Sequence, residues 1–94
     1  MSLLPLAIQS YNDAIELYNM NLKRKYKALA MYIKARHDYD LARVNKSTCI
    51  HELHQLKQEA ALDFFATTHI ANEGLIMVDH AAYQIELVRN MDIN

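Results

Sequence analysis

Histidine and cysteine are the side chains of this sequence best suited to chemistry. His51 and His54 share one face of an expected helix, Cys49 lies one turn before them, and His37 comes from the preceding segment. Zinc requires three or four such ligands at about 2.0–2.3 Å. No closely spaced His-Glu-x-x-His pattern is present, and the ligands would have to be gathered from two segments. We therefore assign no metal, no cofactor and no catalytic residue, and we expect a protein that is not an enzyme.

A regular stripe of apolar and small residues between Ile50 and Val88 dominates the sequence instead. Its members recur at alternating steps of three and four, which keeps one side of an α-helix against a partner helix. Ten of its twelve positions fit, and Lys57 and Thr67 are the exceptions. We interpret the ten as candidate dimer-interface residues. They are Ile50, Leu53, Ala60, Phe64, Ala71, Gly74, Val78, Ala81, Ile85 and Val88.

The first half of the chain carries a stripe of larger side chains. Pro5 fits the first turn of a helix, where its missing amide hydrogen costs nothing. From there the stripe runs through Leu4, Ile8, Tyr11, Ile15, Tyr18 and Leu22 and continues through Tyr26, Leu29, Ile33, His37 and Val44. Several of these are eleven residues apart, as Ile15 and Tyr26 are. A repeat of this length predicts a straighter helix than a strict seven-residue repeat does.

The best break between the two stripes is Asn45-Lys46-Ser47-Thr48. Asparagine tolerates the left-handed conformation that ends a helix, and Ser47 or Thr48 can cap a new one. The sequence therefore predicts one domain over residues 1–94, with a helix over about 4–45, a turn over about 45–48 and a helix over about 48–91. Two helices of nearly equal length joined by a tight turn form an antiparallel hairpin.

The expected fold class is all-α, a long antiparallel helical hairpin that dimerises into a four-helix bundle. The apolar arc on residues 50–88 is wider than one partner helix covers, because a second row runs beside the first. That row consists of Cys49, Leu56, Ile70, Met77 and Met91. Large exposed apolar patches mark interaction sites, so we expect a homodimer. Weaker breaks at residues 19–21 and 71–74 leave one alternative open, a single-chain up-down four-helix bundle.

The charge is nearly balanced in total but unevenly distributed. The net charge of −1 does not favour nucleic-acid binding. It divides into −2 over residues 1–20, +6 over 21–46 and −5 over 47–94. One cysteine excludes an internal disulfide and is compatible with a reducing compartment. No apolar run of about 18 residues and no secretory signal pattern is visible, so we expect a cytoplasmic protein, either free or peripheral to a membrane.

Two stretches resemble a known family. The run from Ala35 to Arg43 contains Asp38-Tyr39-Asp40 and resembles the Asp-Tyr-Asp segment with flanking bases in the second helix of BAR domains. Residues 52–59, followed by Asp63-Phe64, resemble the last helix of the sorting-nexin type. This resemblance implies a dimeric helical bundle that binds curved, anionic membranes through basic side chains. A BAR domain is longer and is kinked at breaks that this chain lacks.

The membrane interpretation depends on eight basic residues of the first half. They are Lys23, Arg24, Lys25, Lys27, Lys34, Arg36, Arg43 and Lys46. Each base near an anionic surface contributes about 1 kcal/mol to binding. The competing interpretation is a solvated face partly paired with acids of the second helix, with Lys34 beside Glu59 and Lys27 near Asp63. The alternative function is a soluble cytosolic chaperone or adaptor that holds a helix of a protein partner in an exposed apolar groove.

Overall fold

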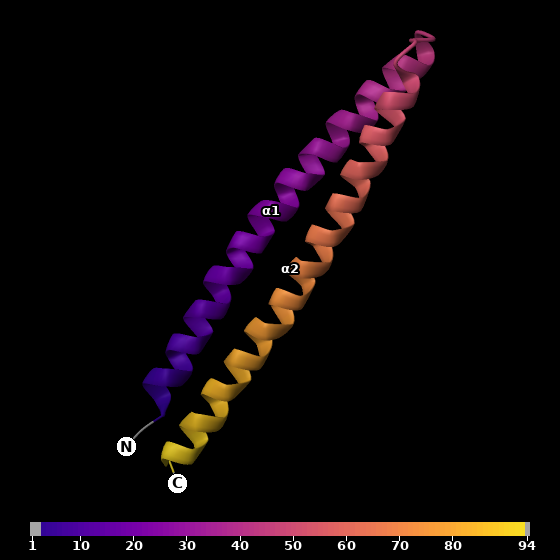
Figure 1. Ribbon diagram of the computed structural model, residues 1–94. Coiled ribbons are helices and arrows are strands. Elements are labelled where there is room, and N and C mark those ends of the chain that lie inside the picture. Colours follow the sequence, from indigo (N-terminus) through magenta and orange to yellow (C-terminus); the bar gives the residue numbers. More distant parts are fainter. Residues whose placement is uncertain (1–2, 94) are drawn as a thin grey trace.

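The protein is a rod made of two long helices. The computed structural model describes the backbone of residues 3–93 and the side chains of residues 3–91. Helix α1 (Leu4–Val44) and helix α2 (Ile50–Ile93) lie side by side along their whole length (Figure 1). The prediction of an all-α helical hairpin is confirmed. Both helices continue through residues 19–21 and 71–74, so the alternative of a single-chain four-helix bundle is wrong.

The rod is much more extended than a globular domain of the same length. It measures 72 × 14 × 13 Å, and its radius of gyration is 21.0 Å. A compact domain of this length has a radius of gyration of about 12 Å. Most residues therefore lie close to solvent, and only the line of contact between the two helices is available as an interior.

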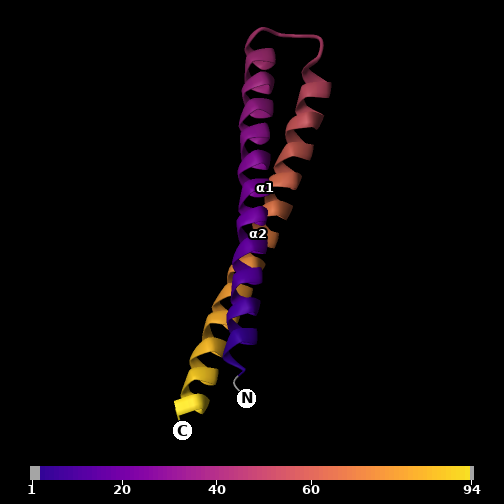
Figure 2. The ribbon, with the colours of Figure 1, turned by 90° about the vertical axis from the view of Figure 1, so that its left-hand side faces the viewer.

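That line of contact, here called the seam, has small residues at strict seven-residue steps, with larger half-buried side chains beside them. On α1 the repeat consists of Ala7, Ala14, Asn21, Ala28, Ala35 and Ala42, all buried or half-buried. On α2 it consists of Ala60, Thr67, Gly74 and Ala81. A strict seven-residue repeat makes two helices wind around each other. The helices accordingly appear side by side in Figure 1 and cross each other in Figure 2.

The seam corrects the interpretation of the first half of the chain. The eleven-residue repeat predicted that Tyr26, Ile33, His37 and Val44 would face the partner helix, but all four are exposed. The seven-residue repeat of small residues continues through the same segment to Ala42. The prediction was right for other members of the stripe, which are half-buried beside the small residues. These are Leu4, Tyr11, Ile15, Tyr18, Leu22 and Leu29.

Gly74 lies where α2 passes close to Tyr18 and Asn21 of α1. It is buried within continuous α2, as the sequence predicted. A Cβ atom added to it would lie 3.4 Å from Cδ1 of Tyr18 and 3.7 Å from the Cα of the same residue. These are ordinary contact distances, so an alanine Cβ would fit between Gly74 and α1. Asn21, the buried polar residue of the seam, lies at the same level, 3.7 Å from that Cβ position.

The turn over residues 45–49 ends α1 with a left-handed residue at Lys46. The φ angle of Lys46 is 53°. The amide of Ser47 donates to the carbonyl of Ala42 at 2.9 Å, and the amide of Lys46 donates to that of Arg43 at 3.4 Å. This pair of bonds is the Schellman arrangement, which usually places glycine at the left-handed position.

The assignment of the left-handed position to Asn45 was therefore wrong. Asn45 has a φ angle of −86°, and its amide donates to the carbonyl of Leu41 at 2.9 Å, so the helical bonding pattern includes it. The capping expectation at the start of α2 is met in part. The hydroxyl oxygen of Ser47 accepts a hydrogen bond from the amide of Cys49 at 3.2 Å, immediately before the helix begins.

Candidate interaction surface

One side of the hairpin exposes most of its large apolar side chains. Three shallow hollows between α1 and α2 are lined by residues of this side. The seam has a seven-residue period, so residues seven positions before or after a lining residue lie on the same side. We call this surface the strip. Its exposed large apolar residues are Leu3, Leu6, Leu17, Met20, Met31, Leu41, Leu56, Ile70, Met77, Leu87 and Met91. They make up eleven of the twenty exposed large apolar residues that the structure describes.

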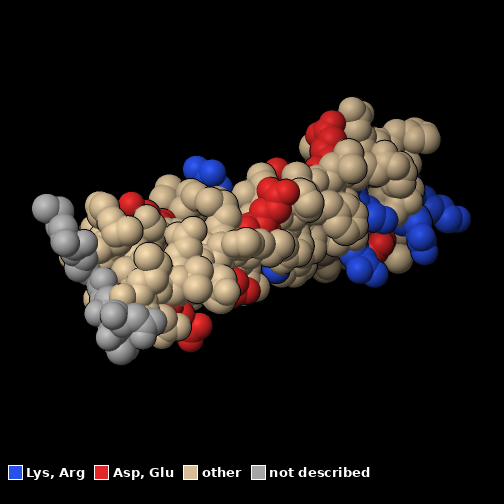
Figure 3. Space-filling view, turned by 90° about the horizontal axis from the view of Figure 1, so that it is seen from below, with Lys and Arg blue, Asp and Glu red and all other residues tan. Residues whose placement is uncertain are grey.

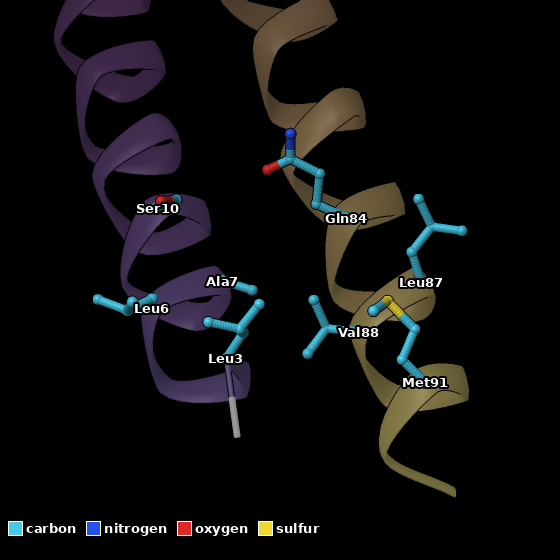
Figure 4. Close-up of a pocket in the computed structure, with 8 residues that line it drawn as sticks. All are labelled: Leu3, Leu6, Ala7, Ser10, Gln84, Leu87, Val88 and Met91. Carbon is cyan, nitrogen blue, oxygen red and sulfur yellow. The ribbon is translucent and has the colours of Figure 1, made fainter. Parts of the chain in front are cut away.

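The hollows are spaced along the strip from the open end of the hairpin toward the turn. The one at the open end has a volume of about 360 Å³ and is lined by both helices. Figure 4 shows Leu3, Ala7 and Val88 extending toward the gap between the helices there. A second hollow of about 300 Å³ lies near the turn, between Met31 on α1 and Leu56 on α2. Apolar side chains of a partner can enter hollows of this kind, which is how helices interdigitate.

Charged side chains border the strip with different signs on its two edges. The α1 edge carries Arg24, Lys27 and Lys34 together with Asp13 and Asp38. The α2 edge carries only acids among its strong charges. These are Glu52, Glu59, Asp63 and Glu73. The two edges therefore carry net charges of +1 and −4.

These opposite charges do not pair within the chain. Between residues 3 and 91 the only ion pair is the one between Nε2 of His69 and Oε1 of Glu73, at 3.0 Å on the exposed surface of α2. The expected pair of Lys34 with Glu59 does not form, and Glu59 instead accepts a hydrogen bond from Gln55 at 3.2 Å. Lys27 and Asp63 line the same hollow, as expected from their level, but they form no ion pair. Pairing of charges across the hairpin is thus not what holds its helices in register.

The eight candidate membrane-binding bases do not share one face. Lys25 is half-buried at the seam, and the other seven are exposed. Arg24, Lys27 and Lys34 border the strip, whereas Arg36 and Arg43 lie on the other side of α1. Their common feature is their position along the rod. Figure 3 shows most of the blue side chains gathered toward the turn, away from the grey terminal residues.

The ten candidate dimer-interface residues all lie along the seam. Ala71, Gly74 and Ala81 are buried against α1, and the other seven are half-buried. Phe64 stacks on Tyr32 of α1 with ring centroids 6.4 Å apart. The stripe therefore supplies the contact within one hairpin. Its role between two copies stays a prediction, while the more exposed apolar surface belongs to the strip beside it.

The histidines and the cysteine are dispersed. The ring of His54 packs against Tyr39 with centroids 5.1 Å apart, and Nζ of Lys57 lies 4.5 Å from the centroid of the same tyrosine. Cys49 is exposed in the turn. Among the residues that the structure describes, no three His, Cys, Asp or Glu side chains are close enough to hold a metal ion. Nor is either described helix long and apolar enough to cross a bilayer.

Comparisons with known proteins add no relative. The chain matches no family model, no curated protein and no solved structure. The resemblance to BAR domains therefore rests on the two short stretches alone.

Sequence reasoning found the α2 half of the strip but missed the α1 half. The row of Cys49, Leu56, Ile70, Met77 and Met91 was visible, whereas Leu6, Leu17, Met20, Met31 and Leu41 were not singled out. The signal that could have found them is the alanine repeat of α1. Once Ala7, Ala28 and Ala42 are placed at the seam, the large residues beside them must lie on its flanks.

Proposed function

We propose that the protein is a non-enzymatic homodimerisation module, in which the strip of one hairpin packs on the strip of a second to form a four-helix bundle. The observation that carries the proposal is the absence of any large, fully buried side chain among the residues that the structure describes. The buried apolar residues are five alanines.

Small domains that lack a sufficient core commonly gain stability by oligomerising. The accessible surface of 7388 Å² supports the same proposal. A compact monomer of this mass exposes only about 5,600 Å². The excess is about twice the roughly 800 Å² that each partner buries in a standard interface.

A matched pair of substitutions on α2 tests the proposal. Ile70 lies on the strip and Ile76 lies on the side of α2 that faces away from α1, and both are about half exposed. Ile70→Asp should dissociate the dimer, because the two-fold symmetry buries two carboxylates in an apolar contact. Ile76→Asp should leave the dimer intact. Sedimentation velocity measures the oligomeric state of both variants. The same oligomeric state in both would mean that the strip is not the dimer interface.

Binding to an anionic membrane is a second candidate function, favoured by bases that form no ion pair with an acid within residues 3–91. Replacing Lys23, Arg36, Arg43 and Lys46 by glutamine removes four exposed bases that do not border the strip. If the candidate function is right, the wild type should co-sediment with vesicles containing anionic lipid, less strongly as salt rises, and the variant should not. Wild-type protein that ignores such vesicles at low salt would exclude this function. A partner helix seated on the strip of a single hairpin, as in a chaperone or adaptor, would instead show as a monomeric wild type.

A further inference from the structure

The charges that border the strip select one of the two ways in which a symmetric dimer can form on it. This inference rests on the proposed homodimer. If the two-fold axis runs parallel to the rods, both turns lie at the same end, and α1 of each copy covers α2 of the other. If the axis is perpendicular to the rods, the turns lie at opposite ends, and α1 covers α1 while α2 covers α2.

With the turns together, each base of the α1 edge meets an acid of the partner. Rotation about an axis parallel to the rods does not change the position of a residue along the rod. Residues at the same distance from the turn within one hairpin are therefore also at the same distance from it across the dimer. Arg24 and Lys27 line the same hollow as Asp63, and Lys34 lines the hollow formed with Leu56 and Ala60, next to Glu59. In the dimer, Lys27 therefore lies beside the partner's Asp63, and Lys34 lies beside the partner's Glu59. These groups are available because none is in an ion pair within its own chain.

With the turns apart, the acidic edge would lie on itself. Glu52, Glu59, Asp63 and Glu73 would all face the α2 edge of the second copy, which offers no lysine or arginine. One favourable contact, between Lys34 and the partner's Asp13, would remain on the α1 edge. No acid of the α2 edge gains a basic partner there, so this arrangement lacks the base–acid contacts of the other one and is disfavoured.

The net charges of the two halves of the rod favour turns at opposite ends, but they act over longer distances than the contacts across the strip. Residues 21–72, around the turn, carry nine bases and five acids, and the remaining residues carry one base and six acids. Turns placed together therefore bring two halves of charge +4 to the same end. Much of that charge, as on Arg36 and Arg43, lies on the side of α1 away from the strip. Screening acts over about 8 Å at physiological ionic strength, which weakens this repulsion more than it weakens contacts across the strip.

We infer that two copies dock through the strip with their turns at the same end, so that the basic α1 edge of each lies on the acidic α2 edge of the other. The surface is thus built for a second copy of this chain in one orientation. It is also self-complementary, because each copy supplies both the basic and the acidic edge.

The single cysteine makes the orientation measurable in the unmodified sequence. Cys49 is exposed in the turn, so it accepts a spin label without a further substitution. Neighbouring helices pack about 10 Å apart, so labels at the same end of a four-helix bundle lie within about 30 Å of each other. With the turns at opposite ends, the labels are separated by most of the 72 Å rod. Electron double-resonance spectroscopy distinguishes these two distances directly.

The inference expects the short distance in a sample whose mass is that of a dimer. A dimer with the long distance would overturn the orientation and leave the proposed homodimer standing. A monomeric mass would instead overturn both, so the two failures are distinguishable. Labelled Ile70→Asp protein is the control, because it should lose the short distance together with the dimer.

A charge-exchange experiment tests the edges themselves. The variant Lys27→Glu with Lys34→Glu makes both edges acidic, and the variant Glu59→Lys with Asp63→Lys raises the net charge of the α2 edge from −4 to 0 while the α1 edge stays at +1. Each variant alone should dimerise at least tenfold more weakly than the wild type, and an equimolar mixture should form a heterodimer. The matched control is Lys23→Glu with Arg43→Glu, which changes the charge equally away from the strip and should leave the affinity within about twofold. A control that weakens dimerisation as much as the edge variants would show that net charge, rather than the edges, determines the affinity.

Discussion

The seam and the strip are adjacent surfaces of the same two helices, but they reverse the usual distribution of side-chain size. The fully buried residues of the seam are alanine, glycine and asparagine, and its larger side chains are only half-buried, whereas the strip exposes leucine, isoleucine and methionine. In a globular domain the large apolar residues would be inside. The difference indicates that the seam is built to bring two backbones close together, while the strip is left to be covered from outside.

The largest change in stability is expected when a large side chain is placed in the seam. Gly74→Leu should destabilise the hairpin by about 1–3 kcal/mol, because the longer side chain must displace Tyr18 or Asn21. Gly74→Ala should instead stabilise it by up to about 1 kcal/mol, since alanine is the better helix former and its Cβ fits at ordinary contact distances. Chemical denaturation measures both. Destabilisation by alanine as well would mean that another backbone lies closer to Gly74 than α1 does.

A smaller effect is expected at the turn, which joins the helices without touching the strip. Lys46 has a left-handed backbone, and that conformation costs a residue with a Cβ about 1–2 kcal/mol relative to glycine. Lys46→Gly should therefore raise the free energy of unfolding by roughly 1 kcal/mol and leave the oligomer unchanged. Thermal unfolding with a parallel mass measurement checks both statements. A loss of stability would contradict the Schellman arrangement of the turn.

The smallest effect is expected on the flank of the seam opposite the strip. The hydroxyl of Thr68 is buried and has no hydrogen-bond partner among residues 3–91. Thr68→Val replaces this hydroxyl by a methyl group of similar shape, which should stabilise the hairpin by about 1 kcal/mol or less. Thr67→Val is the contrasting variant, since the hydroxyl of Thr67 donates to the carbonyls of Asp63 and Phe64. If Thr68→Val is the more destabilising of the two, this flank is covered by a polar partner.

The sequence predicted the helices well because their signals are local. Pro5, the break near Asn45 and the stripe on residues 50–88 each depend on a few neighbouring residues. The α1 side of the seam was harder to predict, because Ala7, Ala28 and Ala42 carry little hydrophobic signal and matter only when the partner helix is in place. The missing ion pairs were harder still. Lys34 and Glu59 lie at a similar distance from the turn, but this alone does not determine whether their side chains are close enough to pair across the hairpin.

Sedimentation equilibrium of the wild-type protein shows whether a second copy of the chain covers the strip. The chain has a mass of 10.9 kDa. At micromolar concentrations we expect a species of twice that mass. Its thermal unfolding midpoint should rise with protein concentration, because folding and association are coupled. A folded species of 10.9 kDa throughout that range, with a midpoint independent of concentration, would contradict the account.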